Sequence, residues 1–215
     1  MSKISGDQRE RIVKKLFEIG RQVFLQKEYG FDPEKLDELL QRAVEGRFDS
    51  QRWREEEEVI YFEVTSDGTT GEQWIKRLEE KGFRVSDYAK SLLLSSDFKP
   101  TSGVTYKVAV LPGTLFADSD RITKKICIEA EPRRLAKPNP EVACLTRDKF
   151  SDEDLEEMGF WYIVTFHDPI KDSVGDPGLL AVGRDGSGRW LHADYGRPGL
   201  GWGSSDGFAF VVSQV

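Results

Sequence analysis

The sequence predicts an α+β protein with an N-terminal helical hairpin, a mixed α/β middle and a glycine-rich antiparallel β unit at its C-terminal end. Apolar residues recur at three- and four-residue steps up to residue 46, as on one face of a helix. From Val59 the pattern changes to strands that alternate with short helices. Glycines at nine positions between 178 and 207 exclude a helix there, because each would cost about 1 kcal/mol relative to alanine.

Two helices are expected in the N-terminal region, residues 1–58. The first covers residues 7–28, and the second begins at Asp32, an N-cap followed by proline, and ends at Gly46. These two helices are expected to pair as an antiparallel hairpin. The glutamate run that follows, within 50–58, is typical of a solvated helix face, with an acidic docking patch as the alternative.

The remaining residues, 59–215, are expected to form one α+β domain. Its first strands are predicted at Val59–Val64, Val104–Leu111 and Phe160–Phe166, the last of them central because it is apolar on both faces. Short helices should begin after caps at Thr70 or Gly71, Ser86, Asp118 or Ser119, and Ser151, and an amphipathic segment covers 142–150. The turn 66–71 lacks a Walker lysine and GxGxxG spacing, so helix capping is expected there rather than phosphate binding.

The last part of this domain, residues 160–215, is predicted to be a recognition unit. Its strands are expected at Leu179–Val182, Arg189–Ala193 and Phe208–Val212. The intervening loops carry aromatic and small polar side chains, namely Arg184, Asp185, His192, Asp194, Tyr195, Arg197, Trp202, Ser204, Ser205 and Asp206. Such side chains on a rigid sheet are typical of a binding surface.

Composition narrows the class of partner and the compartment. A net charge of −7 and a pI near 5.1 argue against a nucleic-acid binder, which needs a basic surface. The chain starts without a signal peptide and has no stretch long enough to span a membrane, so we expect a cytoplasmic protein without membrane contact. In that compartment Cys127 and Cys144 are expected as unpaired buried thiols, with one disulfide as the alternative.

Catalytic and metal-binding patterns are weak. Ser204 or Ser205 with His192 and Asp194 could form a nucleophilic set, and the histidine and aspartate, two apart in a strand, share a face. No G-x-S-x-G elbow accompanies them, so no catalytic residue is assigned. The spacing of Asp168, Asp172 and Asp176 is not that of a calcium-binding EF-hand, and aspartates in such loops commonly form turns. We therefore expect neither a cofactor nor a metal site, with calcium bound by the Asp168–Asp176 loop as the alternative.

The order of features near the C-terminus carries a family likeness. An apolar strand, an Asp/Gly loop, a Gly-Arg-Trp-Leu strand, a Gly-Pro turn, a tryptophan among small residues and a terminal Gly-Phe-Ala-Phe-Val-Val strand follow one another. This order resembles C-type-lectin-like domains, in particular the ligand-binding variable proteins that retroelements diversify in bacteria and phages.

The resemblance implies a scaffold and a set of ligand contacts. The scaffold would be Trp190, Leu191, Trp202, Gly207, Phe208 and Phe210. The ligand contacts that the resemblance implies are Ser187 together with Arg184, Asp185, His192, Asp194, Tyr195, Arg197, Ser204 and Asp206. The disulfide cysteines and the Glu-Pro-Asn calcium motif of animal lectins are missing, and the usual Gly-Phe-Arg ending is Gly-Phe-Ala. Recognition of a protein or peptide is therefore expected rather than of a sugar.

Three functions remain open at this point. The leading prediction is a non-enzymatic recognition protein whose C-terminal surface binds a macromolecular partner, in the first place a protein. The second is a small hydrolase or transferase that uses His167 or His192 with neighbouring aspartates, in a cleft beside the Phe160–Phe166 strand. The third is a structural or adaptor protein that binds through its N-terminal helices.

Overall fold

A computed structural model describes residues 52–172, 174–185 and 188–213, together with Lys14, Phe17 and Gly20; only the backbone of Asp185 is described. The chain divides into two compact units, Met1–Ser50 and Gln51–Val215. The predicted N-terminal hairpin, and with it the adaptor hypothesis, lies outside the described residues apart from those three helical positions.

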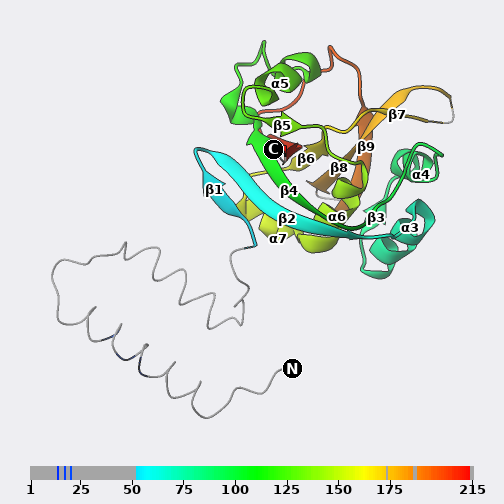
Figure 1. Cartoon of the computed structure of the whole chain (residues 1–215), viewed down its shortest axis with the longest axis horizontal. Coiled ribbons are helices and arrows are strands. Elements are labelled where there is room, and N and C mark those ends of the chain that lie inside the picture. Colours follow the sequence, from blue (N-terminus) through cyan, green and yellow to red (C-terminus); the bar gives the residue numbers. More distant parts are fainter. Residues whose placement is uncertain are drawn as a thin grey trace. The chain divides into compact units, whose positions relative to one another are not determined.

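One mixed sheet of ten strands forms the body of the second unit (Figure 1). The strands are β1 (Arg54–Glu56), β2 (Val59–Asp67), β3 (Arg84–Val85), β4 (Ser102–Pro112), β5 (Leu135–Ala136), β6 (Tyr162–Thr165), β7 (Ile170–Lys171), β8 (Pro177–Asp185), β9 (Gly188–Tyr195) and β10 (Asp206–Val212). Their order is β1-β2-β4-β10-β6-β8-β9-β3, with β5 paired to β10 and β7 to β8. The β6–β10 and β3–β9 pairs are parallel, and the other strand pairs are antiparallel.

Helices pack on both faces of the sheet. They are α3 (Gly71–Glu80), α4 (Asp87–Leu93), α5 (Thr123–Ala130), α6 (Glu141–Lys149) and α7 (Asp152–Glu157), with a 3-10 turn at Gly113–Leu115. One buried cluster joins α3, α4, α6 and α7 to the face that carries Phe62, Val110 and Leu180. A second cluster joins α5 to the opposite face, which carries Leu111, Phe166 and Phe208. Beyond α5, this second face holds the cavity described below.

The predicted fold class is wrong. It placed the glycine-rich C-terminal strands in an antiparallel C-type-lectin-like unit of their own, but β8, β9 and β10 belong to the same sheet as β1–β7. The strand β10 lies between β4 and β6 and runs parallel to β6. The physical reason is burial on both faces: Phe208 and Phe210 enter one cluster and Ala209 enters the other. A strand covered on both sides is stable only inside a sheet.

Many local predictions are confirmed. Thr70 caps α3 in a capping box with Gln73, Ser86 caps α4, and Ser151 caps α7 in a capping box with Asp154. The Phe160–Phe166 segment contains the buried central strand β6, with β10 and β8 as its neighbours.

Two other local predictions are wrong. The glutamate run is not a helix face: Glu57 and Glu58, both with positive φ, form the two-residue turn of the β1–β2 hairpin. The start of α5 has no side-chain cap from Asp118 or Ser119, because its N-cap is Ile122.

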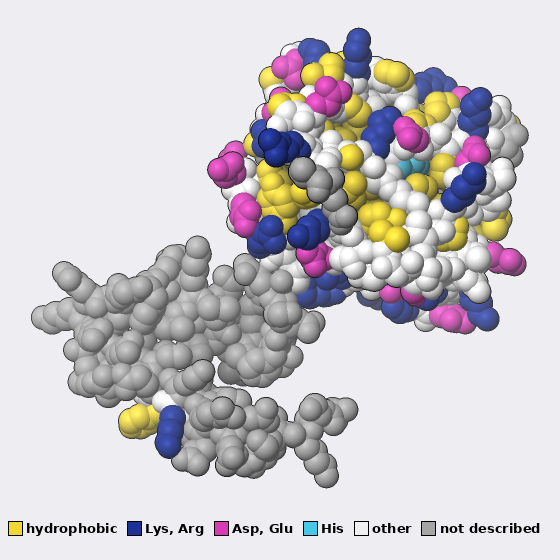
Figure 2. All heavy atoms as spheres, in the orientation of Figure 1, with side chains coloured by type: hydrophobic (Ala, Val, Ile, Leu, Met, Phe, Trp, Pro, Cys, Tyr) yellow, Lys and Arg dark blue, Asp and Glu magenta, His cyan; other side chains and the backbone are white. Residues whose placement is uncertain are grey.

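On the face that Figure 2 shows, basic and acidic side chains are interspersed around small hydrophobic patches over the described unit. No helix within the described ranges is long and apolar enough to cross a membrane.

Candidate functional site

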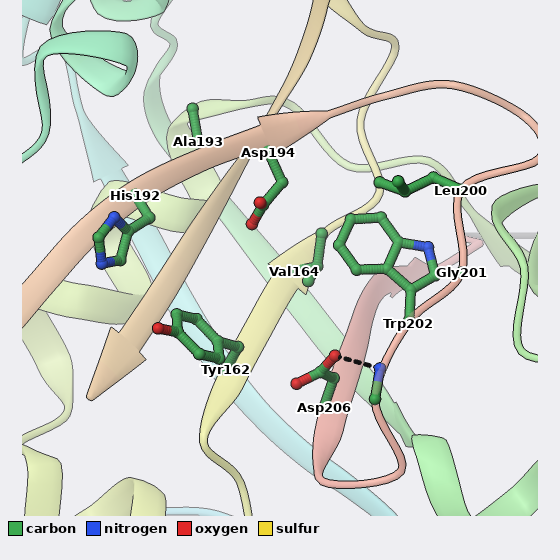
Figure 3. A pocket seen from close by; sticks show the side chains of 10 residues that line it. Tyr162, Val164, His192, Ala193, Asp194, Leu200, Gly201, Trp202 and Asp206 are labelled. Atoms are coloured by element: carbon green, nitrogen blue, oxygen red, sulfur yellow. Dashed lines mark hydrogen bonds between the residues drawn. The ribbon is translucent and has the colours of Figure 1, made fainter. Parts of the chain in front are cut away.

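A cavity of about 480 Å³ lies on the face of the sheet that also carries α5 (Figure 3). Its walls come from β6, β9, the start of β10 and the loop 196–205. The lining residues are Tyr162, Val164, His192, Ala193, Asp194, Leu200, Gly201, Trp202, Gly203 and Asp206. The volume falls in the range of small-molecule sites, about 300 to 1,000 Å³.

Small residues in the strand between β6 and β9 make room for this cavity. In β8, Ala181 pairs with Val164 on one side and His192 on the other, and Gly183 pairs with Tyr162. The rings of Tyr162 and His192 lean over Gly183, with their centroids 5.8 Å apart. A Cβ atom on Gly183 would lie 2.3 Å from Cε1 of Tyr162 and 3.2 Å from Cδ2 of His192. Glycine is therefore required for the two rings to approach each other.

Aromatic rings form much of the wall, and their positions are fixed by contacts outside the cavity. The imidazole of His192 stacks on Trp190 with ring centroids 4.8 Å apart. The indole Nε1 of Trp202 donates to Thr123 Oγ1 at 3.0 Å, and its ring packs 5.9 Å from that of Phe166. The Trp202 side chain thus lines the cavity and also packs against the core.

Two carboxylates face the same space. Figure 3 shows the Asp194 carboxylate pointing between His192, Val164 and Trp202. Burial raises the pKa of Asp194, and the nearby charge of His192 opposes that rise. Burial also raises the pKa of Asp206, whose Oδ2 accepts a hydrogen bond from the Gly203 amide at 2.7 Å; the charge of Asp194 raises this pKa further. Both carboxylates are thus less well solvated than they would be in water.

Besides His192, the cation that acts on these carboxylates is Arg121, whose charge lowers the pKa of Asp206. Its guanidinium is already engaged: Nε donates to Gly113 O at 3.0 Å, and Nη2 donates to Phe116 O and to Asp118 Oδ1. None of the ten residues that line the cavity is Lys or Arg. The part of the cavity wall that the structure describes is therefore acidic and aromatic.

Four of the predicted contact residues, His192, Asp194, Trp202 and Asp206, meet in the cavity. Arg184 and Tyr195 do not, because successive strand residues point to opposite faces and these two point to the face that α3, α4, α6 and α7 cover. Arg184 donates from Nε to Phe160 O at 3.0 Å and forms an ion pair with Glu156 of α7. The Tyr195 ring packs 5.8 Å from that of Tyr88 in α4.

The other predicted contacts also lie elsewhere or are not described. Arg197 donates to Asp176 Oδ1 at 3.1 Å, and Ser204 is exposed in its loop without lining the cavity. Of Asp185 only the strand backbone is described, and Ser187 lies outside the described residues.

Sequence reasoning missed Tyr162, whose ring lies beside that of His192 in the cavity wall. Its signal was present but ambiguous, since a tyrosine in an apolar strand is equally typical of a core. Tyr162 lines the cavity because its strand pairs it with Gly183 on one side and Asp206 on the other. No local sequence pattern encodes that pairing.

His167 is a structural residue and not a base. It is 1% exposed; its Nδ1 donates to Asp168 O at 2.7 Å, and its Nε2 accepts from Leu180 N at 2.9 Å. This arrangement requires the neutral ring, and burial lowers its pKa to about 4. Of the two histidines, only His192 faces the cavity.

Among the described residues no group of His, Cys, Asp and Glu could hold a metal ion. Asp172 instead accepts from the amides of Val174 and Asp176, so it forms a turn as predicted. Cys127 and Cys144 are unpaired, as expected, but only Cys144 is buried, because Cys127 is partly exposed.

Comparison of the chain with protein-family models, with curated proteins and with solved structures gave no match. The likeness to retroelement-diversified variable proteins therefore stays a prediction.

Proposed function

We propose that this chain is a recognition protein whose binding site is the cavity between β6, β9, β10 and the loop 196–205. The cavity takes a small molecule or a single side chain that protrudes from a protein partner. The observation that carries this proposal is the convergence of Tyr162, His192, Asp194, Trp202 and Asp206 on one space of about 480 Å³.

The loop that closes one side of the cavity is held in place, which supports a site that is ready to bind. The Thr123 amide donates to Leu200 O, the Lys124 amide to Pro198 O, and the Trp202 amide to Arg121 O, at 2.9 to 3.1 Å. Two further hydrogen bonds hold the same loop, from the Trp202 indole to Thr123 and from the Gly203 amide to Asp206. Together these contacts attach the loop to the N-terminal end of α5 and to β10. A ligand then avoids much of the free-energy cost of ordering the loop.

Acid–base catalysis is a second candidate, and one observation favours it. His192 and Asp194 line the same cavity beside β6, where the hydrolase hypothesis placed its cleft, and the pKa of Asp194 is raised. A raised carboxyl pKa is typical of catalytic acids, although it also occurs in binding pockets.

A fragment screen followed by NMR tests the proposal. Binding should shift the Trp202 indole N–H and the Gly203 amide N–H and leave the Trp161 indole, on the opposite face of the sheet, unchanged. The controls are Tyr195→Phe, which alters a predicted contact outside the cavity, and Asp168→Asn, which alters an exposed carboxylate. If no fragment at millimolar concentration shifts the cavity signals, the proposal is wrong.

Prolonged incubation of a bound fragment separates the two candidates. A recognition protein leaves the fragment unchanged by mass spectrometry. Conversion that is lost in His192→Gln would establish the catalytic candidate instead.

A further inference from the structure

We infer that the group which enters this cavity is an organic cation, an ammonium or guanidinium, held between the aromatic walls and the carboxylates of Asp194 and Asp206. The inference rests on the proposed function and names the ligand chemistry of the same site.

The charge balance of the wall is the first argument. Two carboxylates face the cavity, Arg121 is committed to two carbonyl oxygens and Asp118, and the lining contains no lysine or arginine. Attraction between opposite charges is several-fold stronger at a partly buried site than in water. The same two carboxylates would repel an anionic ligand such as a phosphate. The wall therefore selects positive ligands.

The aromatic lining is the second argument. Rings attract cations through the negative potential of their faces, most strongly for tryptophan. This protein uses that contact elsewhere: the Arg184 guanidinium lies 4.6 Å from the ring centre of Trp161, and that of Arg197 lies 4.8 Å from the ring centre of Tyr195. Within the described residues no lysine or arginine covers the Trp202 ring in this way. Trp202 thus combines a fixed ring with an acidic neighbourhood.

The size and polarity of the site distinguish an organic cation from a metal ion. A cavity of about 480 Å³ is far larger than one ion, and the described residues hold no cluster of three metal ligands. Aromatic walls beside carboxylates suit a cation that carries apolar substituents, since the rings cover its carbon atoms while the carboxylates balance its charge.

The charged neighbours of the carboxylates fix the direction of the pH dependence. His192 acts on Asp194, and Asp194 and Arg121 act on Asp206. A cation binds best when both carboxyls are ionised and His192 is neutral. Affinity should therefore rise with pH as these groups lose their protons and then level off.

Two matched pairs of probes test the inference on the full-length protein by NMR titration. Choline is compared with 3,3-dimethylbutan-1-ol, which has the same shape without the charge. N-methylguanidinium is compared with N-methylurea. We expect at least one cation to bind about tenfold or more tightly than its neutral partner. Asp194→Asn should remove most of that advantage, whereas Asp168→Asn should leave it unchanged.

Three outcomes would overturn the inference. In the first, the neutral partners bind as tightly as the cations. In the second, Asp194→Asn has no effect on the cation's advantage. In the third, neither cation binds although neutral fragments shift the Trp202 indole, and then the proposed function stands while its ligand class is wrong. If nothing at all binds in the cavity, both proposals fail.

Discussion

Gly183→Ala is the sharpest test of how the cavity is built. The new methyl carbon would lie 2.3 and 2.5 Å from two carbons of the Tyr162 ring, where ordinary contacts begin near 3.4 Å. The ring must therefore retreat by about 1 Å or more, which changes the cavity wall that it forms with His192. Overpacking of this kind costs about 1 to 3 kcal/mol. We expect a loss of stability in that range and weaker ligand binding.

A double-mutant cycle identifies the cause of that loss. In a Tyr162→Ala background the ring is gone, so Gly183→Ala should cost less than about 0.5 kcal/mol, and the coupling energy should exceed about 0.5 kcal/mol. Urea denaturation followed by tryptophan fluorescence measures all four proteins. Gly199→Ala is the control, because no atom lies within 4 Å of its added carbon. An equal cost of Gly183→Ala with and without the Tyr162 ring would refute the explanation of the cavity.

Three further predictions concern polar groups that are buried or partly buried. Because the folded pKa of His167 is about 4 and its ordinary value is 6.5, folding favours the neutral ring. This preference contributes about 3 kcal/mol to the free energy of unfolding above pH 6.5, and the contribution is lost as the pH falls toward 4. The difference in stability between the wild type and His167→Gln should therefore shrink over that pH interval in denaturation curves. A difference that stays constant with pH would contradict this. Glu141, 1% exposed, accepts from Thr101 N, Thr101 Oγ1 and Tyr106 OH. Glu141→Ala should cost about 3 kcal/mol and Glu141→Gln clearly less, by the same assay, and equal costs would exclude the hydrogen bonds as the reason. The pKa of Asp194 is raised, so its ionised form opposes folding, and Asp194→Asn should increase the thermal midpoint at pH 7 while it weakens cation binding. A lower midpoint would show that this carboxylate stabilises the fold.

The features that the sequence predicted well are those that depend on neighbours in the chain. The caps at Thr70, Ser86 and Ser151 were predictable because a hydroxyl three residues before a free amide is a local arrangement. The shared face of His192 and Asp194 was predictable for the same reason, since strand residues two apart point the same way.

The features that it predicted wrongly depend on pairing between distant segments. The central place of β10 follows from its parallel register with β6, Asp206 opposite Tyr162, and nothing near residue 206 encodes that partner. The misplacement of Arg184 has a related cause. The strand β8 is apolar on both faces, as Ala181 and Val182 show, so its sequence gives no sign of which side faces the helices.

A crystal structure of the full-length protein soaked with choline tests the central claim most directly. We expect the trimethylammonium group to lie inside the cavity, within about 6 Å of the Trp202 ring and beside the Asp194 carboxylate. A cavity that stays empty at saturating choline, or a cation bound only on the opposite face of the sheet, which α3, α4, α6 and α7 cover, would contradict this claim.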